Sequence, residues 1–275
     1  MMATQSANYA WLRGLALPLA ILVLWEFVCD MGWVQAIVLP SPHAVALRWW
    51  AALVPAQPYD GAQGSYFAWL FSGELLRDAG ASMWRIVVGF LIGALPALPL
   101  GLAMGSSDRA YAYFNPLIQI LRPIPPIAFI PLAILWFGLG NPPAYFLIAL
   151  GAFFPVLMNT IAGVRSVDGI YLRAARNLGA SPGRIFISVM LPAAMPYILA
   201  GIRIGIGTAF IVVIVAEMIA VNSGIGYRIL EAREYMWSDK IIAGMVTIGL
   251  LGLAIDVGVN RLNTHLLRWH RGLER

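Results

Sequence analysis

Long apolar runs separated by short polar segments dominate the chain. Residues 86–107 and 123–164 contain no Asp, Glu, Lys or Arg. Because one membrane-spanning helix needs about 20 apolar residues, the first run predicts one span and the second predicts two spans joined by a turn. The turn is indicated by a cluster of helix-breaking residues, which reads Gly138-Leu139-Gly140-Asn141-Pro142-Pro143.

Three further apolar runs complete the pattern, and each contains ionisable residues. They are 15–39 with Glu26 and Asp30, 193–220 with Arg203 and Glu217, and 241–260 with Asp256. The sequence therefore predicts an all-α membrane protein with about six transmembrane helices. A signal peptide is the alternative for the first run, but the run is long and lacks a small-x-small cleavage site, which favours a retained first span.

Arginine is distributed unevenly between the segments that join the spans. One set of ends carries 11 arginines: Arg13, Arg109, Arg122, Arg165, Arg173, Arg176, Arg184, Arg261, Arg268, Arg271 and Arg275. On the opposite ends, Arg48, Arg77, Arg228, Arg233 and Lys240 are offset by nearby carboxylates. Since cytoplasmic loops carry the excess of Lys and Arg, we expect a multi-pass protein with both termini in the cytoplasm.

Composition removes several classes of function. The chain is 60% hydrophobic and 11% charged, against about 25% charged residues in soluble domains. The net charge of +5 lies between apolar runs, so it indicates membrane orientation and not nucleic-acid binding. Lys240 is the only lysine and belongs to no phosphate-binding loop, and the three histidines and Cys29 form no metal-binding or nucleophile motif. We therefore expect no catalytic residues, no metal and no cofactor on this chain, which is not expected to be an enzyme.

The segment 165–191 is polar and basic, and its pattern predicts two short amphipathic helices. One face of the first carries four residues at helical spacing: Tyr171, Ala174, Ala175 and Leu178. Gly179 follows where a helix C-terminus favours a left-handed residue, and Ser181-Pro182 supplies an N-cap and a first helical position. The apolar face of the second helix comprises Ile185, Phe186, Val189 and Met190. The pattern alone also fits a pair of helices that lie in the membrane interface, anchored by arginine to anionic lipid.

This segment resembles the EAA loop of permease subunits from ABC-type importers. The motif is Glu-Ala-Ala, three residues, Gly, nine residues, Ile, one residue and Leu-Pro. The chain matches its spacing with Ala174, Ala175, Gly179 and Leu191-Pro192. Two positions differ, because Arg173 replaces the Glu and Val189 replaces the Ile. The Arg173 difference puts in doubt any salt bridge that the family makes there.

Two more segments, 121–140 and 216–235, resemble the branch of that family that imports sulfonates, taurine, nitrate or bicarbonate. The resemblance implies a type I importer fold and a single transmembrane permease domain over 1–275. The first span would lie at about 12–39, the core spans at about 82–267 and the coupling loop at about 165–191. Within that loop, the residues expected to contact a separate ATPase are Arg173, Ala174, Ala175, Gly179, Ser181, Leu191 and Pro192.

The partners implied by this resemblance all lie on other chains. They are two ATPase subunits that hold ATP and Mg, a second permease copy that makes a homodimer, and a periplasmic or lipid-anchored solute-binding protein. The implied location is the bacterial inner membrane. The implied function is inward movement of a small anionic solute by alternating access. Alternatives are another solute, such as an aromatic acid or a pyrimidine precursor, and a secondary transporter or channel that works alone.

Four residues are candidates for the solute pathway or its gate: Glu217, Asn222, Pro125 and Pro126. An ionisable group inside a membrane helix is costly unless it is paired or hydrated, so Glu217 is a functional candidate. It could tether helices near the external side, through Arg228 or Arg233, or it could contact solute. The prolines fit either ordinary membrane-helix composition or kinked helices around a pathway. Asp256 and Glu26 are weaker candidates, because either could reach an interface.

Overall fold

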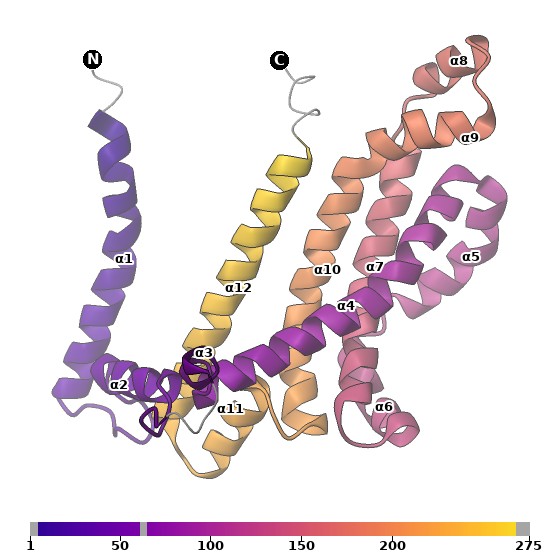
Figure 1. The fold of residues 1–275 in the computed structure, drawn as a ribbon. Coiled ribbons are helices and arrows are strands. Elements are labelled where there is room, and N and C mark those ends of the chain that lie inside the picture. Colours follow the sequence, from indigo (N-terminus) through magenta and orange to yellow (C-terminus); the bar gives the residue numbers. More distant parts are fainter. Residues whose placement is uncertain (1–4, 61–64, 268–275) are drawn as a thin grey trace. The chain divides into compact units, whose positions relative to one another are not determined.

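A computed structural model describes residues 5–60 and 65–267, and every regular element in these ranges is helical (Figure 1). The long helices are α1 (Gln5–Asp30), α4 (Glu74–Ser106), α7 (Asn141–Arg165), α10 (Leu191–Ala220) and α12 (Ser238–Leu266). The shorter helices are α2 (Pro42–Leu53), α3 (Tyr66–Leu70), α5 (Asp108–Leu121), α6 (Ile130–Phe137), α8 (Gly169–Asn177), α9 (Pro182–Ile185) and α11 (Ile225–Glu234). A 3₁₀ helix (Pro126–Phe129) precedes α6, and a π-helix (Phe186–Met190) joins α9 to α10.

The chain forms two compact units. The first comprises residues 1–78 and 228–248, and the second comprises residues 79–227 and 249–275. The boundaries fall inside α4, α11 and α12. The larger second unit contains the segment 165–191, the pathway candidates and most of the apolar core.

Helices α4, α7 and α10 form the core of the second unit. Small residues recur every fourth position on the face of α4 that contacts α7: Gly89, Gly93, Ala97, Gly101 and Gly105. A Cβ atom on Gly101 would lie 2.7 Å from the Thr160 Cβ, and one on Gly89 would lie 2.6 Å from the Ile148 Cβ. Small residues at this spacing let membrane helices approach closely, where van der Waals packing stabilises the pair. The stripe therefore fixes how α4 packs on α7.

The segment between α4 and α7 corrects two sequence-based predictions. Arg109 and Arg122 were expected in a segment that joins two spans, but residues 108–121 form the helix α5, whose N-cap Ser107 accepts a hydrogen bond from Ala110 N. The run that starts at residue 123 was expected to hold a complete span before the turn at 138–143, but α6 is only 8 residues long. The prolines at 123, 125 and 126 interrupt the helix because they have no backbone N–H to donate. The two halves, 108–121 and 126–137, are bent by 79°.

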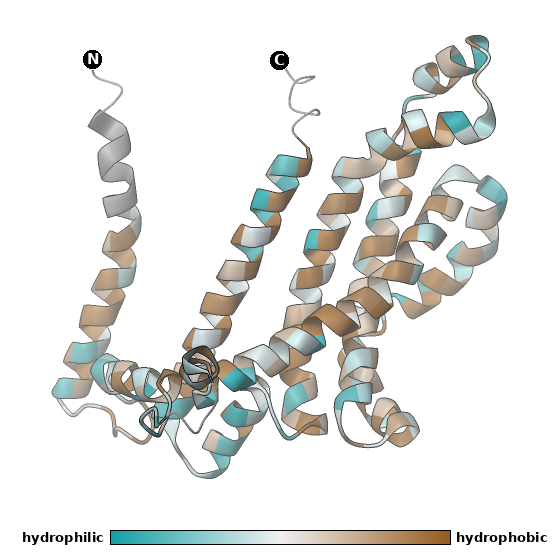
Figure 2. Cartoon of the chain, in the orientation of Figure 1, coloured by the Kyte–Doolittle hydropathy of each residue, from teal (hydrophilic) through white to brown (hydrophobic). Residues whose placement is uncertain are grey.

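Four helical stretches in the described part of the chain are long and apolar enough to cross a membrane, and the bent pair could add a fifth. The four are α4, α7, α12 and the continuous stretch Pro182–Ala220 that includes α10. Figure 2 shows apolar residues along these helices and polar residues on α8 and α9. The all-α membrane fold is therefore confirmed. About six spans were expected, and the described residues contain four, or five if the bent pair is one span. The first expected span coincides in part with α1, which ends at Asp30 and not at residue 39.

The first unit is held together by polar contacts of α2, α4, α11 and α12. The Trp49 Nε1 donates to Thr247 Oγ1 at 2.9 Å, which joins α2 to α12. Arg228 lies 2.6 Å from Asp78 and 3.2 Å from Glu74. Burial lowers the pKa of the Arg228 guanidinium, but hydrogen bonds to Asp78 and Glu231 outweigh it, so the pKa is raised overall. Arg228 is therefore fixed as a cation by its acidic neighbours.

The prediction that both termini are cytoplasmic depends on residues at the two ends of the chain. Residues 1–4 and 268–275, with Arg268, Arg271 and Arg275 among them, lie outside the described residues. The side chain of Arg13 is likewise outside the described part. The orientation of the termini therefore stays a prediction.

Candidate functional site

The segment 165–191 folds as two short helices, as its pattern predicts. The N-cap of α8 is Asp168, whose carboxylate accepts from Ile170 N at 2.8 Å. The N-cap of α9 is Ser181, whose hydroxyl accepts from Arg184 N at 3.4 Å. Pro182 occupies the start of α9, where a missing N–H costs nothing. Capping thus defines where each helix begins.

Gly179 forms the bend between the two helices. Its φ of +80° lies in the left-handed region, which is strongly disfavoured for residues with a Cβ. Two backbone hydrogen bonds close the end of α8, from Gly179 N to Arg176 O at 2.9 Å and from Ala180 N to Ala175 O at 3.1 Å. This pairing is the Schellman arrangement at a helix C-terminus. The angle between α8 and α9 is therefore set by the glycine.

The apolar face of α8 is uncovered. Tyr171 is 65% exposed and Leu178 is 87% exposed, and no residue of α8 is buried. The motif residues Arg173 and Ala174 are also exposed, whereas Ala175 is half-buried. A helix with an apolar face that its own chain leaves open is typical of a surface that binds something else.

The far end of this segment continues directly into a membrane span. Ile185 is buried, and the residues after it form a π-helix in which Leu191 N donates to Phe186 O. Leu191 and Pro192 are the first residues of α10. The stretch Pro182–Ala220 is therefore a single 39-residue helical rod. A displacement at Ser181 would be transmitted to the span without an intervening loop.

Glu217, the charged candidate within α10, is completely buried and fully hydrogen-bonded. Its carboxylate accepts from Arg85 Nη1 at 2.7 Å, from Ser82 Oγ at 2.9 Å and from Gly226 N at 3.0 Å. The Ser82 hydroxyl in turn accepts from Ile225 N at 3.1 Å. These bonds join α4 to the end of α10 and to the start of α11.

Arg85 completes the network from the other side. Its guanidinium donates to the amide oxygen of Asn141 at 2.8 Å, and to the backbone oxygen and hydroxyl of Ser223 at 2.9 and 2.6 Å. A buried ion pair is tolerated when its remaining hydrogen-bonding groups are satisfied in this way. We call Ser82, Arg85, Asn141, Glu217 and Ser223 the Glu217 network.

The partner of Glu217 differs from the sequence-based expectation. Arg228 or Arg233 was expected, but the ion pair is made by Arg85, while Arg228 binds Asp78, Glu74 and Glu231. Arg85 directly precedes a long uncharged run, so it could be taken for a loop residue. The usable signal was that Arg85 at the edge of the run 86–107 and Glu217 inside the run 193–220 are charges of opposite sign. Of the other pathway candidates, Asn222 lies exposed beside this network.

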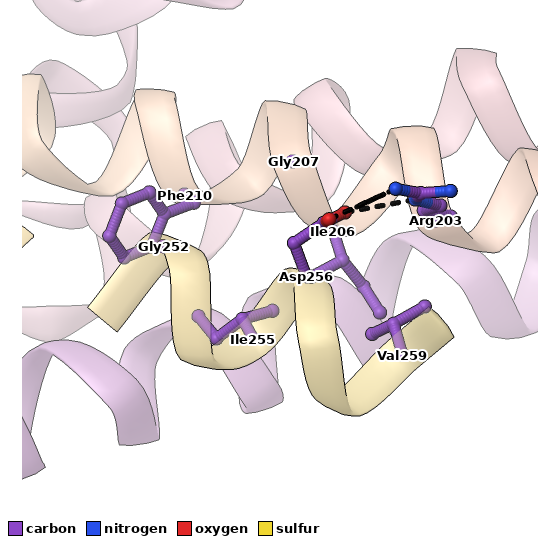
Figure 3. A pocket seen from close by; sticks show the side chains of 8 residues that line it. All are labelled: Arg203, Ile206, Gly207, Phe210, Gly252, Ile255, Asp256 and Val259. Carbon is purple, nitrogen blue, oxygen red and sulfur yellow. Dashed lines mark hydrogen bonds and ion pairs between the residues drawn. The ribbon is translucent and has the colours of Figure 1, made fainter. Parts of the chain in front are cut away.

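A second polar contact within the apolar helices joins α10 to α12. Arg203 and Asp256 form a two-bond ion pair, with Nε to Oδ1 at 2.9 Å and Nη2 to Oδ2 at 3.0 Å. Figure 3 shows this pair beside a pocket of about 160 Å³ whose other walls include Phe210, Ile255 and Gly252. Both charged side chains remain about half exposed. Sequence reasoning named Asp256 as a weak candidate and did not pair it with Arg203.

Pro125 and Pro126 line a larger hollow in the second unit. It measures about 350 Å³ and lies where the bent segment between α5 and α6 meets α7 and α10. Its walls are mainly apolar, and its polar lining residues are Arg122, Asn159 and Thr208. Neither Glu217 nor Asn222 belongs to this lining. The four pathway candidates thus fall at two separate places, two in the hollow and two at the end of α10.

Comparison with known proteins accounts for most of the chain. Residues 97–272 match the family described as binding-protein-dependent transport system inner membrane component. A Bacillus subtilis relative named as an aliphatic sulfonates transport permease protein, SsuC, is 37% identical over 97% of this chain and 91% of its own length. The Escherichia coli taurine transport system permease protein TauC is 34% identical over 91% of this chain and 86% of its own. The nitrate import permease protein NrtB of Synechocystis is 32% identical over 86% of this chain and 82% of its own length.

Solved structures support the same fold. The MetNI methionine ABC transporter in an inward-facing conformation matches with a TM-score of 0.63 and 18% sequence identity. The match covers 71% of this chain and 97% of the MetNI chain. At this identity the likeness concerns the fold, which is that of an ABC importer permease. The chain therefore belongs to the family of binding-protein-dependent transport system inner membrane components, in the branch that contains the sulfonate, taurine and nitrate permeases.

Proposed function

We propose that the chain is the transmembrane subunit of an ATP-driven importer for a small anionic solute of the sulfonate, taurine, nitrate or bicarbonate class. The relatives named for aliphatic sulfonates, taurine and nitrate support this solute class. The family description supports delivery of the solute by a separate binding protein. The proposed location is the bacterial inner membrane, and the proposed complex holds two copies of this chain and two ATPase subunits with their ATP and Mg.

One observation carries the ATPase-coupling part of this proposal. The open apolar face of α8, with Tyr171 and Leu178, is joined through Gly179 to the continuous rod that begins at Pro182. An ATPase subunit that covers this face would bury exposed apolar area, worth about 25 cal/mol per Å². Its movement during ATP hydrolysis would then reach α10 directly and change which side of the membrane the pathway faces. The proposed mechanism is alternating access.

A lipid-facing α8 is the competing explanation for the same exposed face. Exposed arginines surround it, including Arg173, Arg176 and Arg184, and such a pattern suits anionic headgroups. The Gly179→Val variant separates the two explanations. Valine is strained at the left-handed φ of this position, so the angle between α8 and α9 must change. A docked ATPase requires that angle, whereas a helix pair lying on lipid tolerates a different one.

The experiment compares wild type and Gly179→Val at matched membrane levels. We expect the variant to insert normally but to lose ATPase co-purification, or to hydrolyse ATP without solute uptake. Gly183→Val is the matched control, because Gly183 lies in the same segment, has no positive φ and has no atom within 4 Å of an added Cβ. Wild-type uptake with full ATPase association in Gly179→Val would show that this segment is not the coupling element.

A further inference from the structure

The hollow beside Pro125 and Pro126 combines a cation with apolar walls. Arg122 follows the last residue of α5 and lines the hollow. Among the described residues, the other arginines of the second unit that lie at or within the spans have acidic partners: Arg85 with Glu217, Arg165 with Asp108 and Arg203 with Asp256. Arg122 forms no ion pair with any residue in the described part of the chain. Its charge is thus available to a ligand.

Asn159 presents a second hydrogen-bond donor to the hollow. Its Nδ2 donates to Pro155 O at 2.9 Å, and an amide nitrogen carries two hydrogens, so one remains. Thr208 contributes differently, because its hydroxyl hydrogen is donated to Ile204 O at 2.7 Å. The donors left for a ligand are therefore the Arg122 guanidinium and the second amide hydrogen of Asn159.

The hollow lies near the middle of the length of the two long helices that line it, α7 and α10. Pro155 is about 21 Å along α7 from Asn141 and about 15 Å from Arg165, at 1.5 Å per residue. Thr208 is about 25 Å from the start of α10 and about 18 Å from its end by the same rise. A site in the middle third of both helices would lie near the centre of the bilayer. Arg122, which lines the hollow, would then lie within the membrane and not with the cytoplasmic arginines among which the sequence pattern placed it. Irregular backbone at such depth is tolerated where it lines a cavity, and the break at residues 122–126 meets that condition.

We propose that this hollow is the site where the solute anion pauses in the membrane, with Arg122 and Asn159 as its polar ligands. The inference rests on the proposed function, which makes the solute an anion. The Arg122 guanidinium presents several donors to oxyanion oxygens, and Asn159 adds one more. Phe154, Met158 and Ile204 supply apolar lining, which suits the alkyl portion of a sulfonate. Two ligands in an open hollow give weak binding, and a transport site has to release its solute.

The test uses the complex reconstituted in vesicles with its ATPase and its binding protein. The probes are radiolabelled ethanesulfonate, taurine, nitrate and bicarbonate. Asn159→Asp replaces the donor by a carboxylate of the same size, which repels an anion. Arg122→Gln removes the charge, and Arg122→Lys retains it. We expect the first two variants to lower uptake of a transported probe about ten-fold or more, the effect of losing one hydrogen bond to a charged group. Arg122→Lys should keep a substantial part of the wild-type uptake.

A second readout separates a lost site from a misfolded protein. ATP turnover stimulated by the loaded binding protein should persist in both variants, so that more ATP is hydrolysed per solute molecule moved. Arg109→Gln is the matched control, because Arg109 is an exposed arginine of α5 outside the hollow. It should transport as wild type does.

The outcomes separate the two proposals. If the wild-type complex takes up none of the four probes, the proposed anionic solute class fails and the anion site fails with it. If the wild-type complex takes up a probe and Arg122→Gln and Asn159→Asp do so equally well, the site is overturned while the proposed function stands. Loss of stimulated ATP turnover together with uptake would also overturn the site, because removal of a solute ligand alone should leave that turnover intact.

Discussion

A glycine with a positive φ lies near each end of the helical rod that contains α10, one in an open and one in a buried environment. Gly179 precedes the rod that leads into α10, and Gly224 follows α10, and both have a positive φ, +80° and +103°. A Cβ added to Gly179 would meet no atom within 4 Å, whereas one added to Gly224 would overlap the Glu217 carboxylate. Leu178 beside the first glycine is 87% exposed, and Glu217 beside the second is completely buried.

The end of the helix at Gly224 is therefore fixed by packing, whereas the end at Gly179 is open for a partner. The Glu217 network joins α4, α7, α10 and α11 through charge-assisted hydrogen bonds, so its geometry is over-determined. The opposite end has helix caps and a bend but no covering layer. A helix anchored at one end and open at the other suits a lever that another subunit displaces. The following substitutions test that contrast.

Removal of Arg85 should produce the largest effect. Arg85→Ala leaves the Glu217 carboxylate buried without its counter-ion, and breaking a buried pair in this way costs about 3–5 kcal/mol. We expect little folded protein, measured as the fraction that survives detergent extraction and heating. Arg203→Ala is the control, because Arg203 and Asp256 are each about half exposed, and its loss should be clearly smaller. Equal losses would mean that burial does not distinguish the two pairs.

The same substitution at the two glycines should have unequal effects. Gly224→Ala places a Cβ against Glu217 in addition to its backbone strain, and overpacking alone costs about 1–3 kcal/mol. Gly179→Ala meets only the strain of the left-handed conformation, about 1–2 kcal/mol. In the same detergent, Gly224→Ala should therefore unfold at a lower temperature than Gly179→Ala. The opposite ranking would contradict the description of the Gly179 end as open.

Loss of the cap on α9 should have a smaller effect. Ser181→Ala removes the acceptor for Arg184 N, which costs about 1 kcal/mol at a typical N-cap. We expect ATPase association to weaken while the membrane level stays unchanged, and Ser181→Asp should restore association because aspartate is also a good cap. If both variants weaken association equally, the hydroxyl acts by contact with a partner and not as a cap.

Cysteine labelling should reveal the two sides with the least disturbance. In a Cys29→Ser background, cysteines at the exposed positions Ser181 and Asn222 should react with impermeant reagents from opposite faces, with 181 cytoplasmic. Ser223 is less suitable, since its hydroxyl bonds Arg85 at 2.6 Å. Labelling of both positions from one face would overturn the orientation inferred from the arginine distribution.

The sequence by itself determined the features that depend on local order along the chain. The apolar runs predicted α4, α7, α10 and α12, since burial in lipid requires length and composition alone. Helix signals of capping and left-handed glycine predicted Ser181 as a cap and Gly179 as the bend, because these signals act over a few neighbouring residues. The spacing of Ala174, Gly179 and Pro192 also indicated the family that the comparisons established.

The tertiary structure decided what depends on residues far apart in the sequence. Arg85 and Glu217 are 132 positions apart, and nothing local in either segment specifies the other as its partner. The same holds for Arg203 with Asp256, and for the convergence of Arg122 and Asn159 on one hollow. Pro125 and Pro126 left open whether the helix breaks at residues 122–126, because hydropathy measures apolar content and not the backbone hydrogen bonds that closely spaced prolines remove.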